Sequence, residues 1–421
     1  MIDHFEGLEI LDSRGRPTVQ ATCVLKNGIR ASASVPSGAS TGKYEAHELR
    51  DGDPERYRGK GCLQAASHLE GEISSALSGK DVQTQEALDR FLIELDGTPN
   101  KKRLGANAIL AASVAFARAQ ALDRGLPLYQ HFSSLLGQPV ERYPRMTINL
   151  FSGGLHAGRQ VPIQDVLIIP ASPETFREGL EMTSRVYLAA VDLLAEKYGE
   201  RWLTADEGGL SPPVSSGEAL LENAVWAIEK AGLEPGQDVY LAMDVASSHF
   251  YENGSYAYED CHLEASAMID LLSQFATKYP LASIEDGLAE EDWAHWSVLN
   301  EQLKGKALVL GDDLLCTNPQ RIRRAIEEAS CNALLLKVNQ IGTLTEALEA
   351  YQLARRAGWN ITISVRSGDT EDHWYSDLVV GWSGDQTKAG SITQSERLSK
   401  YNRLLEIEKN LSLPVHPWPH S

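Results

Sequence analysis

The sequence predicts an α/β protein in which an eight-stranded (β/α)8-like barrel follows a smaller N-terminal α+β domain. In the C-terminal two thirds, short apolar segments recur and each ends in a charged or polar residue. Stretches with a helical apolar pattern separate these segments. Repeated strand and helix units imply a parallel sheet, and so many in series favour a closed barrel over an open sheet. The first third differs, because its strands come first and its helices afterwards.

The first third is expected to form an antiparallel meander of three strands, followed by helices. Asn27 and Gly28 are a strong hairpin signal between the second and third strands. We place the domain boundary near Gly137, which gives a small N-terminal α+β domain over residues 1–137 and an α/β barrel over 138–421. The expected strands are residues 7–12, 18–25 and 29–35, and the expected helices are residues 63–78, 84–95 and 105–122.

The stretch from Asn332 to Gln340 is the most informative strand of the barrel. Four consecutive apolar residues are typical of a buried parallel strand, and Lys337 stands directly after them. A buried ammonium group either finds a carboxylate or loses its proton near neutral pH, and the second outcome suits a general base. Alternatively, Lys337 ends the strand and reaches solvent.

Other strand ends carry acids and bases that the barrel would bring to one mouth. Asp244, Glu285 and Asp312 end successive apolar segments, and three carboxylates would repel one another there. A divalent cation relieves that repulsion, and an all-oxygen ligand set suits Mg²⁺ rather than Zn²⁺. The alternative is a set of salt bridges to the basic strand-end residues Lys337, Lys388 and Arg366.

A lysine base facing a metal held by carboxylates can remove a weakly acidic proton next to a substrate carboxylate. The metal then stabilises the resulting enediolate. Enzymes that combine a lysine or histidine base with one or two Mg²⁺ ions are known to work in this way. Glu207 could protonate a leaving hydroxyl group. The residues therefore indicate proton abstraction followed by elimination.

Two glycine-rich stretches could contribute to such a site. Residues 36–43 offer hydroxyl groups and flexible backbone that could fold over a phosphate or a metal, although the Walker pattern is absent. His156 and the Asp206-Glu207-Gly-Gly turn are weak signals separately, because each is more often structural than catalytic.

Composition excludes some classes of partner. The chain has 421 residues and a formal charge of -19, which argues against a general nucleic-acid partner or an anionic membrane surface. The five cysteines form no Cys-x-x-Cys pair and are expected to be reduced packing residues of a cytoplasmic protein. We expect no signal peptide and no membrane span.

Taken together, these residues resemble the enolase (phosphopyruvate hydratase) family over essentially the whole chain. The resemblance implies a lid domain on an enolase-type barrel whose first strands depart from simple alternation. It also implies the glycolytic, Mg²⁺-dependent interconversion of 2-phosphoglycerate and phosphoenolpyruvate by a homodimer or larger homo-oligomer. The matching motifs are Ser37-Gly-Ala-Ser-Thr-Gly, Asp206-Glu-Gly-Gly, Ser283-Ile-Glu-Asp, Gly311-Asp-Asp-Leu, Leu334-Leu-Leu-Lys-Val-Asn-Gln, Arg366-Ser-Gly and Ser395-Glu-Arg-Leu-Ser-Lys-Tyr-Asn.

Position by position, the resemblance makes Lys337 the base at the substrate C2 carbon and Glu207 the acid at the hydroxyl group. Lys388 would bind the substrate carboxylate, and Arg366 and Ser367 the phosphate. The remaining assignments are His156, Gln164 and Asp165 at the substrate, Asp244, Glu285 and Asp312 as ligands of the first Mg²⁺, and Ser40 at the second.

Four positions depart from the family pattern. Asp165 stands where the family has glutamate, and Val365 replaces the histidine of Ser-His-Arg-Ser-Gly. Arg159 and Gly287 replace an asparagine and a proline. Two alternatives therefore stay open: an enolase paralogue of specialised metabolism, similar to carboxyphosphonoenolpyruvate synthases, that acts on another phosphorylated or phosphonylated acid, and a non-catalytic binding protein.

Overall fold

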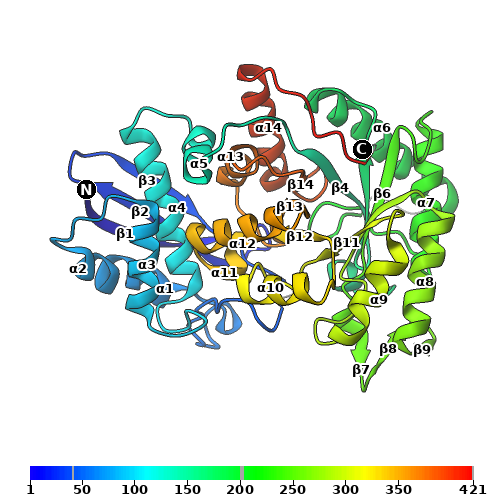
Figure 1. The fold of residues 1–421 in the computed structure, drawn as a ribbon, viewed down its shortest axis with the longest axis horizontal. Coiled ribbons are helices and arrows are strands. Elements are labelled where there is room, and N and C mark those ends of the chain that lie inside the picture. The colour runs from blue at the N-terminus through cyan, green and yellow to red at the C-terminus, as the bar shows by residue number, and fades with distance from the viewer. Residues whose placement is uncertain (40–41, 200–202, 420–421) are drawn as a thin grey trace.

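The computed structural model of the protein describes residues 1–39, 42–199 and 203–419. Its N-terminal domain and its barrel lie beside each other along the longest axis (Figure 1). The α/β fold class predicted from the sequence is confirmed, with an antiparallel sheet in the first part and a closed barrel in the second. The helices of the described part include none that could cross a membrane.

The N-terminal sheet is the predicted meander, in the order β1-β2-β3 with antiparallel pairing. Gly28 adopts a φ of 88° in the hairpin turn, a conformation that glycine reaches without strain. The sequence reading missed α5, which begins directly after Pro127. The elements are β1 (Ile2–Leu11), β2 (Pro17–Leu25), β3 (Arg30–Ser34), α1 (Leu63–His68), a π turn (Leu69–Ile73), α2 (Ser74–Leu77), α3 (Gln85–Asp96), α4 (Ala106–Asp123) and α5 (Leu128–Leu136).

Eight strands close the barrel in the order β10-β11-β12-β13-β14-β4-β5-β6. All neighbours pair in parallel except β5, which runs antiparallel to both β4 and β6. This is the expected departure from simple alternation in the first strands. The strands are β4 (Arg145–Ser152), β5 (Asp165–Pro170), β6 (Val239–Asp244), β10 (Leu281–Glu285), β11 (Leu308–Gly311), β12 (Ala333–Leu336), β13 (Asn360–Ser364) and β14 (Gln386–Lys388).

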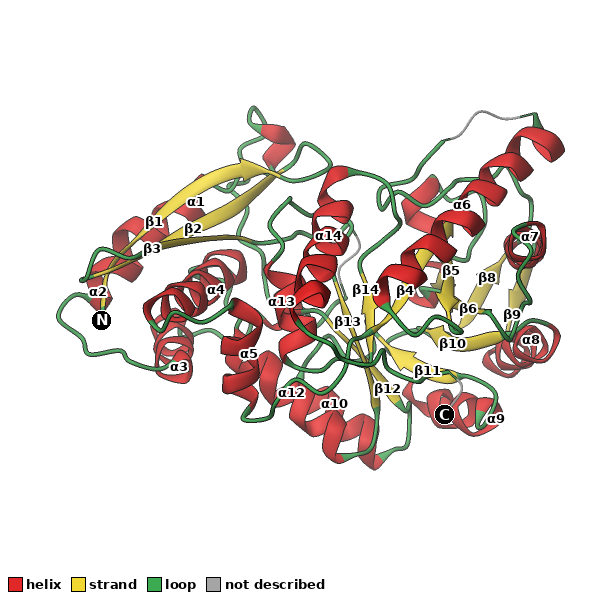
Figure 2. Cartoon of the chain, turned by 90° about the horizontal axis from the view of Figure 1, so that it is seen from above, coloured by secondary structure: helices red, strands yellow, loops and turns green. Residues whose placement is uncertain are grey.

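Helices surround the barrel, and a small sheet of β7, β8 and β9 projects beside α8 (Figures 1 and 2). Thr175 and Glu178 form a capping box at the start of α6. These elements are α6 (Phe176–Tyr198), α7 (Gly217–Lys230), β7 (Tyr251–Glu252), β8 (Ser255–Tyr258), β9 (Cys261–Leu263), α8 (Ala265–Lys278), α9 (Trp293–Leu303), α10 (Pro319–Glu327), α11 (Val338–Ile341), α12 (Leu344–Arg356), α13 (Trp374–Gly381) and α14 (Ser395–Asn410).

The central helix α4 joins the two parts of the molecule. It packs against β2 and β3 on one side and against α11 and α12 of the barrel on the other. Nearly all of its residues are buried, as expected for a helix that is apolar all round. A buried ion pair between Lys101 and Glu346, with 3.0 Å between Nζ and Oε2, adds to this contact. The N-terminal domain is therefore held against the barrel, while the boundary near Gly137 remains a prediction.

Candidate functional site

Five charged residues predicted from the sequence gather at one rim of the barrel. Asp244 and Glu285 are the last residues of β6 and β10, and Asp312 directly follows β11. Lys337 follows β12, and Lys388 ends β14. Parallel strands place their C-terminal ends on one side of a barrel, so residues far apart in the sequence meet there.

The two lysines form ion pairs with the three acids. Nζ of Lys388 lies 2.6 Å from Oε2 of Glu285 and 3.2 Å from Oδ2 of Asp244. Nζ of Lys337 lies 2.5 Å from Oδ2 of Asp312. The structure therefore contains the salt bridges that the sequence analysis left open for these two lysines. The third expected base, Arg366, pairs instead with Glu45 of the N-terminal domain.

These contacts decide the charge of the predicted base. Burial lowers the pKa of Lys337, but the carboxylate of Asp312 raises it, and the net direction is above the ordinary value. Lys337 is therefore a cation in this structure and cannot accept a proton until the influence of Asp312 is weakened. Of the two outcomes foreseen for a buried lysine, the structure shows the pairing with a carboxylate.

The strand-end acids have the donor set that a divalent cation needs. Asp244, Glu285 and Asp312 offer carboxylate oxygens and no sulfur or nitrogen, which suits Mg²⁺. Oε1 of Glu285 is buried and has no hydrogen-bond partner among the described residues. Burial and the nearby Asp244 raise the pKa of Glu285 well above its ordinary value. An added positive charge at this position would relieve both the unpaired oxygen and the repulsion.

A further acid, Asp286, shapes the turn that presents Asp312. Its two carboxylate oxygens accept hydrogen bonds from the backbone N–H groups of Asp312, at 2.9 Å, and Asp313, at 2.7 Å. Possible ligand atoms of Asp286, Asp312 and Asp313 lie within 4.8 Å of one another. Because Asp286 is already used by the backbone, we assign it a structural role. The sequence contained a signal for these acids, because two adjacent acidic residues stand at the end of two strands, Glu285-Asp286 and Asp312-Asp313.

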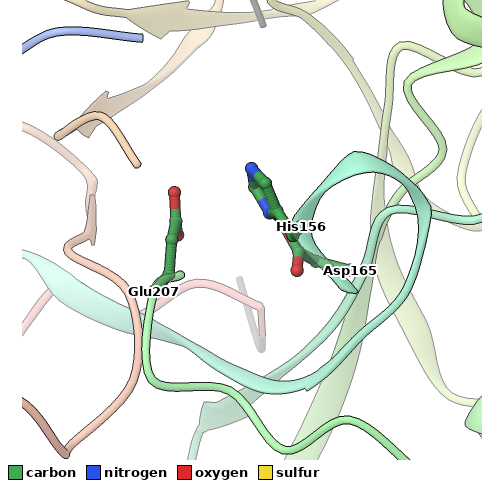
Figure 3. Close-up of side chains that lie close together, drawn as sticks. All are labelled: His156, Asp165 and Glu207. Atoms are coloured by element: carbon green, nitrogen blue, oxygen red, sulfur yellow. Dashed lines mark hydrogen bonds and ion pairs between the residues drawn. The ribbon is translucent and has the colours of Figure 1, made fainter. Parts of the chain in front are cut away.

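His156, Asp165 and Glu207 form a second cluster, with possible ligand atoms within 4.8 Å of one another. Asp165 begins β5, and because β5 is antiparallel its first residue pairs in register with Asp244 on the same rim. In Figure 3 the imidazole of His156 and the carboxylate of Glu207 point to the same side. The three residues come from different segments, so only the closed barrel brings them together.

Electrostatics place a proton on His156. Burial lowers its pKa, but the charge and hydrogen bond of Asp165, with Glu207 and Asp244, raise it to about 9. Burial raises the pKa of Glu207, but the positive charges of His156 and then Arg397 lower it by more, so the pKa lies below its ordinary value. Near neutral pH the cluster therefore contains an imidazolium and an ionised Glu207.

Protein groups occupy both carboxylate oxygens of Asp165. Oδ1 accepts hydrogen bonds from Asn149, at 2.7 Å, and Ser152, at 2.8 Å. Oδ2 lies 2.9 Å from Nδ1 of His156. This arrangement gives Asp165 the role of holding His156 in place, while its direct contact with substrate stays a prediction.

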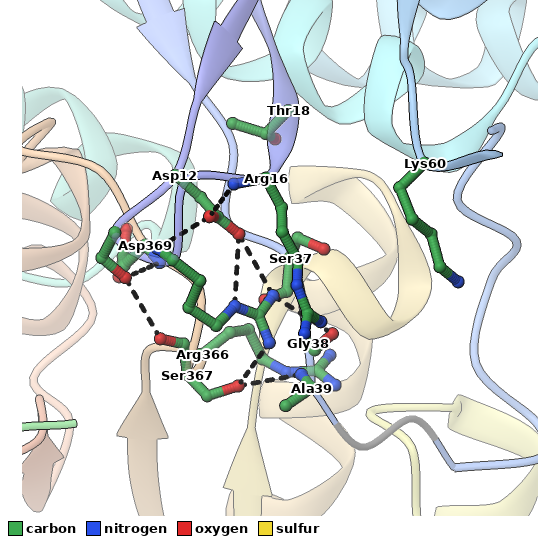
Figure 4. A network of polar contacts seen from close by, with 12 residues as sticks. Asp12, Arg16, Thr18, Ser37, Gly38, Ala39, Lys60, Arg366, Ser367 and Asp369 are labelled. Atoms are coloured by element: carbon green, nitrogen blue, oxygen red, sulfur yellow. Dashed lines mark hydrogen bonds and ion pairs between the residues drawn. The ribbon is translucent and has the colours of Figure 1, made fainter. Parts of the chain in front are cut away.

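Arg366 and Ser367 lie where the N-terminal domain meets the barrel rim. The guanidinium of Arg366 pairs with Glu45, with 2.8 Å between Nη1 and Oε2, and also donates to Oδ1 of Asn339 at 3.2 Å. Oγ of Ser367 accepts a hydrogen bond of 2.8 Å from the backbone N–H of Ala39. Figure 4 shows Ser367 and Ala39 in one polar network.

Gln164 lies at the same rim as the strand-end acids. Its Nε2 donates a hydrogen bond of 3.2 Å to Oδ2 of Asp244. Its Oε1 atom is buried without a hydrogen-bond partner among the described residues. Ser40, the predicted ligand of a second metal, lies outside the described residues.

Comparison with known protein families agrees with this geometry. The family model described as "Enolase, C-terminal TIM barrel domain" matches residues 141–416, and the model described as "Enolase, N-terminal domain" matches residues 2–132.

The chain belongs to the enolase family.

It is therefore an enolase-type lyase, and the rim with Lys337 and Glu207 is its candidate active site. The partners of several site residues had no signal in the sequence of this enolase family member. Glu45, the ion-pair partner of Arg366, stands in a polar stretch without a recognisable motif. Asn149 and Ser152, which donate to Asp165, were also missed as functional residues because short polar side chains near a strand end are common.

Proposed function

We propose that this protein is a Mg²⁺-dependent lyase that converts 2-phosphoglycerate to phosphoenolpyruvate and water. One observation carries the proposal: a potential base and a potential acid face each other across the barrel mouth. Lys337 follows β12. Glu207 lies in one cluster with Asp165, which begins β5, and three other strands separate β12 from β5 in either direction around the closed barrel. A substrate between them would have its C2 proton on one side and its hydroxyl group on the other.

Lys337 is proposed as the base that removes the C2 proton. Its pKa is raised by Asp312 in this structure, so the base function requires another positive charge to take up that carboxylate. Asp244, Glu285 and Asp312 fit Mg²⁺ and would hold it. When bound, Mg²⁺ supplies positive charge next to the substrate carboxylate, where negative charge develops as the proton leaves.

The cluster around Glu207 is proposed to supply the proton that the departing hydroxyl group needs. Glu207 is ionised in the structure and the nearby His156 is protonated. Glu207 must therefore receive a proton before it can act as an acid, and His156 is the nearest charged donor in the cluster. Asp165 keeps His156 protonated and oriented.

The cationic side chains would hold the two acidic ends of the substrate. Lys388 is buried among the strand-end acids, where it pairs with Asp244 and Glu285, and it would bind the substrate carboxylate. Arg366 and Ser367 would bind the phosphate group, because a guanidinium presents several N–H donors in a fixed plane. With His156, Gln164 and Asp165, these residues form the proposed substrate site, and Ser40 is kept as a proposed ligand of a second metal.

A second candidate is a paralogue that acts on another phosphorylated or phosphonylated acid. Val365 favours it, because this apolar residue is only 5% exposed and stands directly before Arg366, which is proposed to bind phosphate. An apolar residue there replaces the polar, titratable histidine of the family pattern, which alters the surroundings of the leaving hydroxyl group. The complete set of base, acid and metal-binding residues disfavours a non-catalytic binding protein. We further propose a cytoplasmic, glycolytic homo-oligomer.

The decisive experiment is the formation of phosphoenolpyruvate from 2-phosphoglycerate in the presence of Mg²⁺. We expect turnover that EDTA abolishes and that added Mg²⁺ restores. If 2-phosphoglycerate shows neither turnover nor exchange of its C2 proton while Mg²⁺ still binds, 2-phosphoglycerate is not the substrate and the paralogue becomes the better assignment.

A further inference from the structure

A basic cavity lies beside the candidate active site, on the N-terminal domain. It has a volume of about 470 Å³, which falls within the usual range for small-ligand pockets. The turn between β1 and β2 forms one wall, and the segment around Ser37 and Gly38 forms another. The arginines and lysines that line it are Arg14, Arg16, Lys43, Arg50 and Lys60.

Two of the lining arginines are already compensated by carboxylates. Arg14 pairs with Asp12, with 3.1 Å between Nη2 and Oδ2, and Arg50 pairs with Glu48 at 2.7 Å. These arginines also donate to the backbone and to Ser37, which fixes the shape of the wall. They therefore form the frame of the cavity and contribute little free charge.

Three other lining cations, Arg16, Lys43 and Lys60, are exposed and form no salt bridge with any residue that the structure describes. The carboxylate of Glu290 lies near Lys43, because it accepts a hydrogen bond of 3.1 Å from the backbone N–H of Lys43. In Figure 4 the side chain of Arg16 extends beside Ser37 toward Gly38, and Lys60 is drawn apart from the other labelled residues. Uncompensated cations around one cavity are notable in a chain with a formal charge of -19, because the rest of the surface repels anions.

The cavity adjoins the proposed phosphate-binding pair but does not include it. Ala39 and Arg14 separate the two, because both line the cavity and both donate to Oγ of Ser367, at 2.8 Å and 3.4 Å. The guanidinium of Arg366 is held by Glu45 on this boundary. An anion in the cavity would therefore meet Arg16 and Lys60 rather than the catalytic rim.

We propose that this cavity is a second anion site, which binds a ligand of the diphosphate class. Three separated cations in a cavity of this size fit an anion with two or more phosphoryl groups better than a single phosphate. Lysine and arginine are the usual donors to phosphoryl oxygens. The diphosphate could be inorganic or part of a nucleoside diphosphate. This site is independent of the reaction proposed above and stands even if 2-phosphoglycerate is not the substrate.

The test is calorimetry with pyrophosphate, ADP and inorganic phosphate on the full chain, in EDTA so that no metal is present. We expect pyrophosphate to bind more tightly than phosphate, and to bind more weakly as ionic strength rises. The double variant Arg16→Ala/Lys60→Ala should weaken pyrophosphate binding at least about tenfold, because it removes two charged donors. Both residues are exposed, so the variant should fold normally.

A matched control is Lys26→Ala/Lys102→Ala, which removes two exposed cations from the same domain outside the cavity. It should bind pyrophosphate like the unmodified chain.

Three results would overturn the proposal: no pyrophosphate binding by the unmodified chain, undiminished binding by Arg16→Ala/Lys60→Ala, or equal weakening in the control variant. If ADP binds more tightly than pyrophosphate and depends on the same two residues, the ligand is a nucleoside diphosphate. If pyrophosphate alone binds, it is an inorganic diphosphate.

Discussion

Asp165→Asn should move the proton out of the acid cluster of the candidate active site. In the native protein Asp165 raises the pKa of the buried His156 to about 9. The difference from the ordinary value of 6.5 corresponds to about 3 kcal/mol in favour of the imidazolium form. The asparagine side chain keeps the shape but removes the negative charge. Burial, which lowers the pKa of a histidine, then acts with little opposition.

We expect the pKa of His156 to fall by at least about two pH units in Asp165→Asn. The assay is NMR titration of protein labelled with ¹³C in its histidine rings, in EDTA, with the His156 signal identified by its absence in His156→Gln. Ser152→Ala is the matched control, because it removes a hydrogen bond of 2.8 Å to the same carboxylate without removing the charge. In this control the pKa of His156 should stay well above its ordinary value.

The same shift has a consequence for stability. The folded-state pKa of His156 lies above the unfolded value, so its contribution to stability is present in full below about pH 6.5 and is lost as the pH rises through about 9. The free energy of unfolding of the native chain relative to Asp165→Asn should therefore fall over this range, by up to about 3 kcal/mol. The reasoning is refuted if His156 titrates at or below 6.5 in the native chain, or if Asp165→Asn leaves its pKa unchanged.

Three further predictions concern the proposed base, metal and substrate surroundings. Lys337→Ala should reduce both C2 proton exchange of 2-phosphoglycerate with deuterated solvent and phosphoenolpyruvate formation by at least about 10² to 10⁴, measured by NMR; retention of exchange would exclude Lys337 as the base. Asp312→Ala should weaken Mg²⁺ binding at least about tenfold in calorimetry, because one of three carboxylate ligands is lost, whereas the exposed Asp260→Ala should not; equal affinities would move the metal elsewhere. In the native chain, exchange should outpace elimination, and Val365→His with Asp165→Glu should raise elimination more than exchange; the opposite order would show that these positions do not limit loss of the hydroxyl group.

Strands, helices and the identity of the rim residues could be predicted from the sequence. The apolar run before Lys337 has the pattern of a buried parallel strand, and the structure places β12 at Ala333–Leu336. Such patterns are local, because burial on both faces of a strand requires consecutive apolar residues. The start of α12 is equally local, because the side chain of Thr343 accepts a hydrogen bond from the backbone N–H of Glu346, three residues later.

Partner choice among the charged residues could not be predicted. The sequence offered Arg366 as a partner for the strand-end acids, but in the structure it pairs with Glu45, far earlier in the chain. The protein partners of Asp165 were likewise not predicted: its Oδ1 accepts hydrogen bonds from Asn149 and Ser152, while its contact with substrate stays a prediction. Each choice depends on distances of a few ångströms, and in a buried site such distances decide which charges are neutralised.

The sequence by itself determined the enolase-type α/β architecture, the strand ends and the kinds of side chain at the barrel mouth, because periodicity and residue chemistry are properties of short segments. Only the tertiary structure decided that Lys337 is held as a cation by Asp312 and that His156 carries the proton beside Glu207. It also decided that three cations without a salt bridge among the described residues line a separate cavity. Closure of the barrel and docking of the N-terminal domain bring distant segments within hydrogen-bonding range, and the pKa and pairing of a buried group follow from those neighbours.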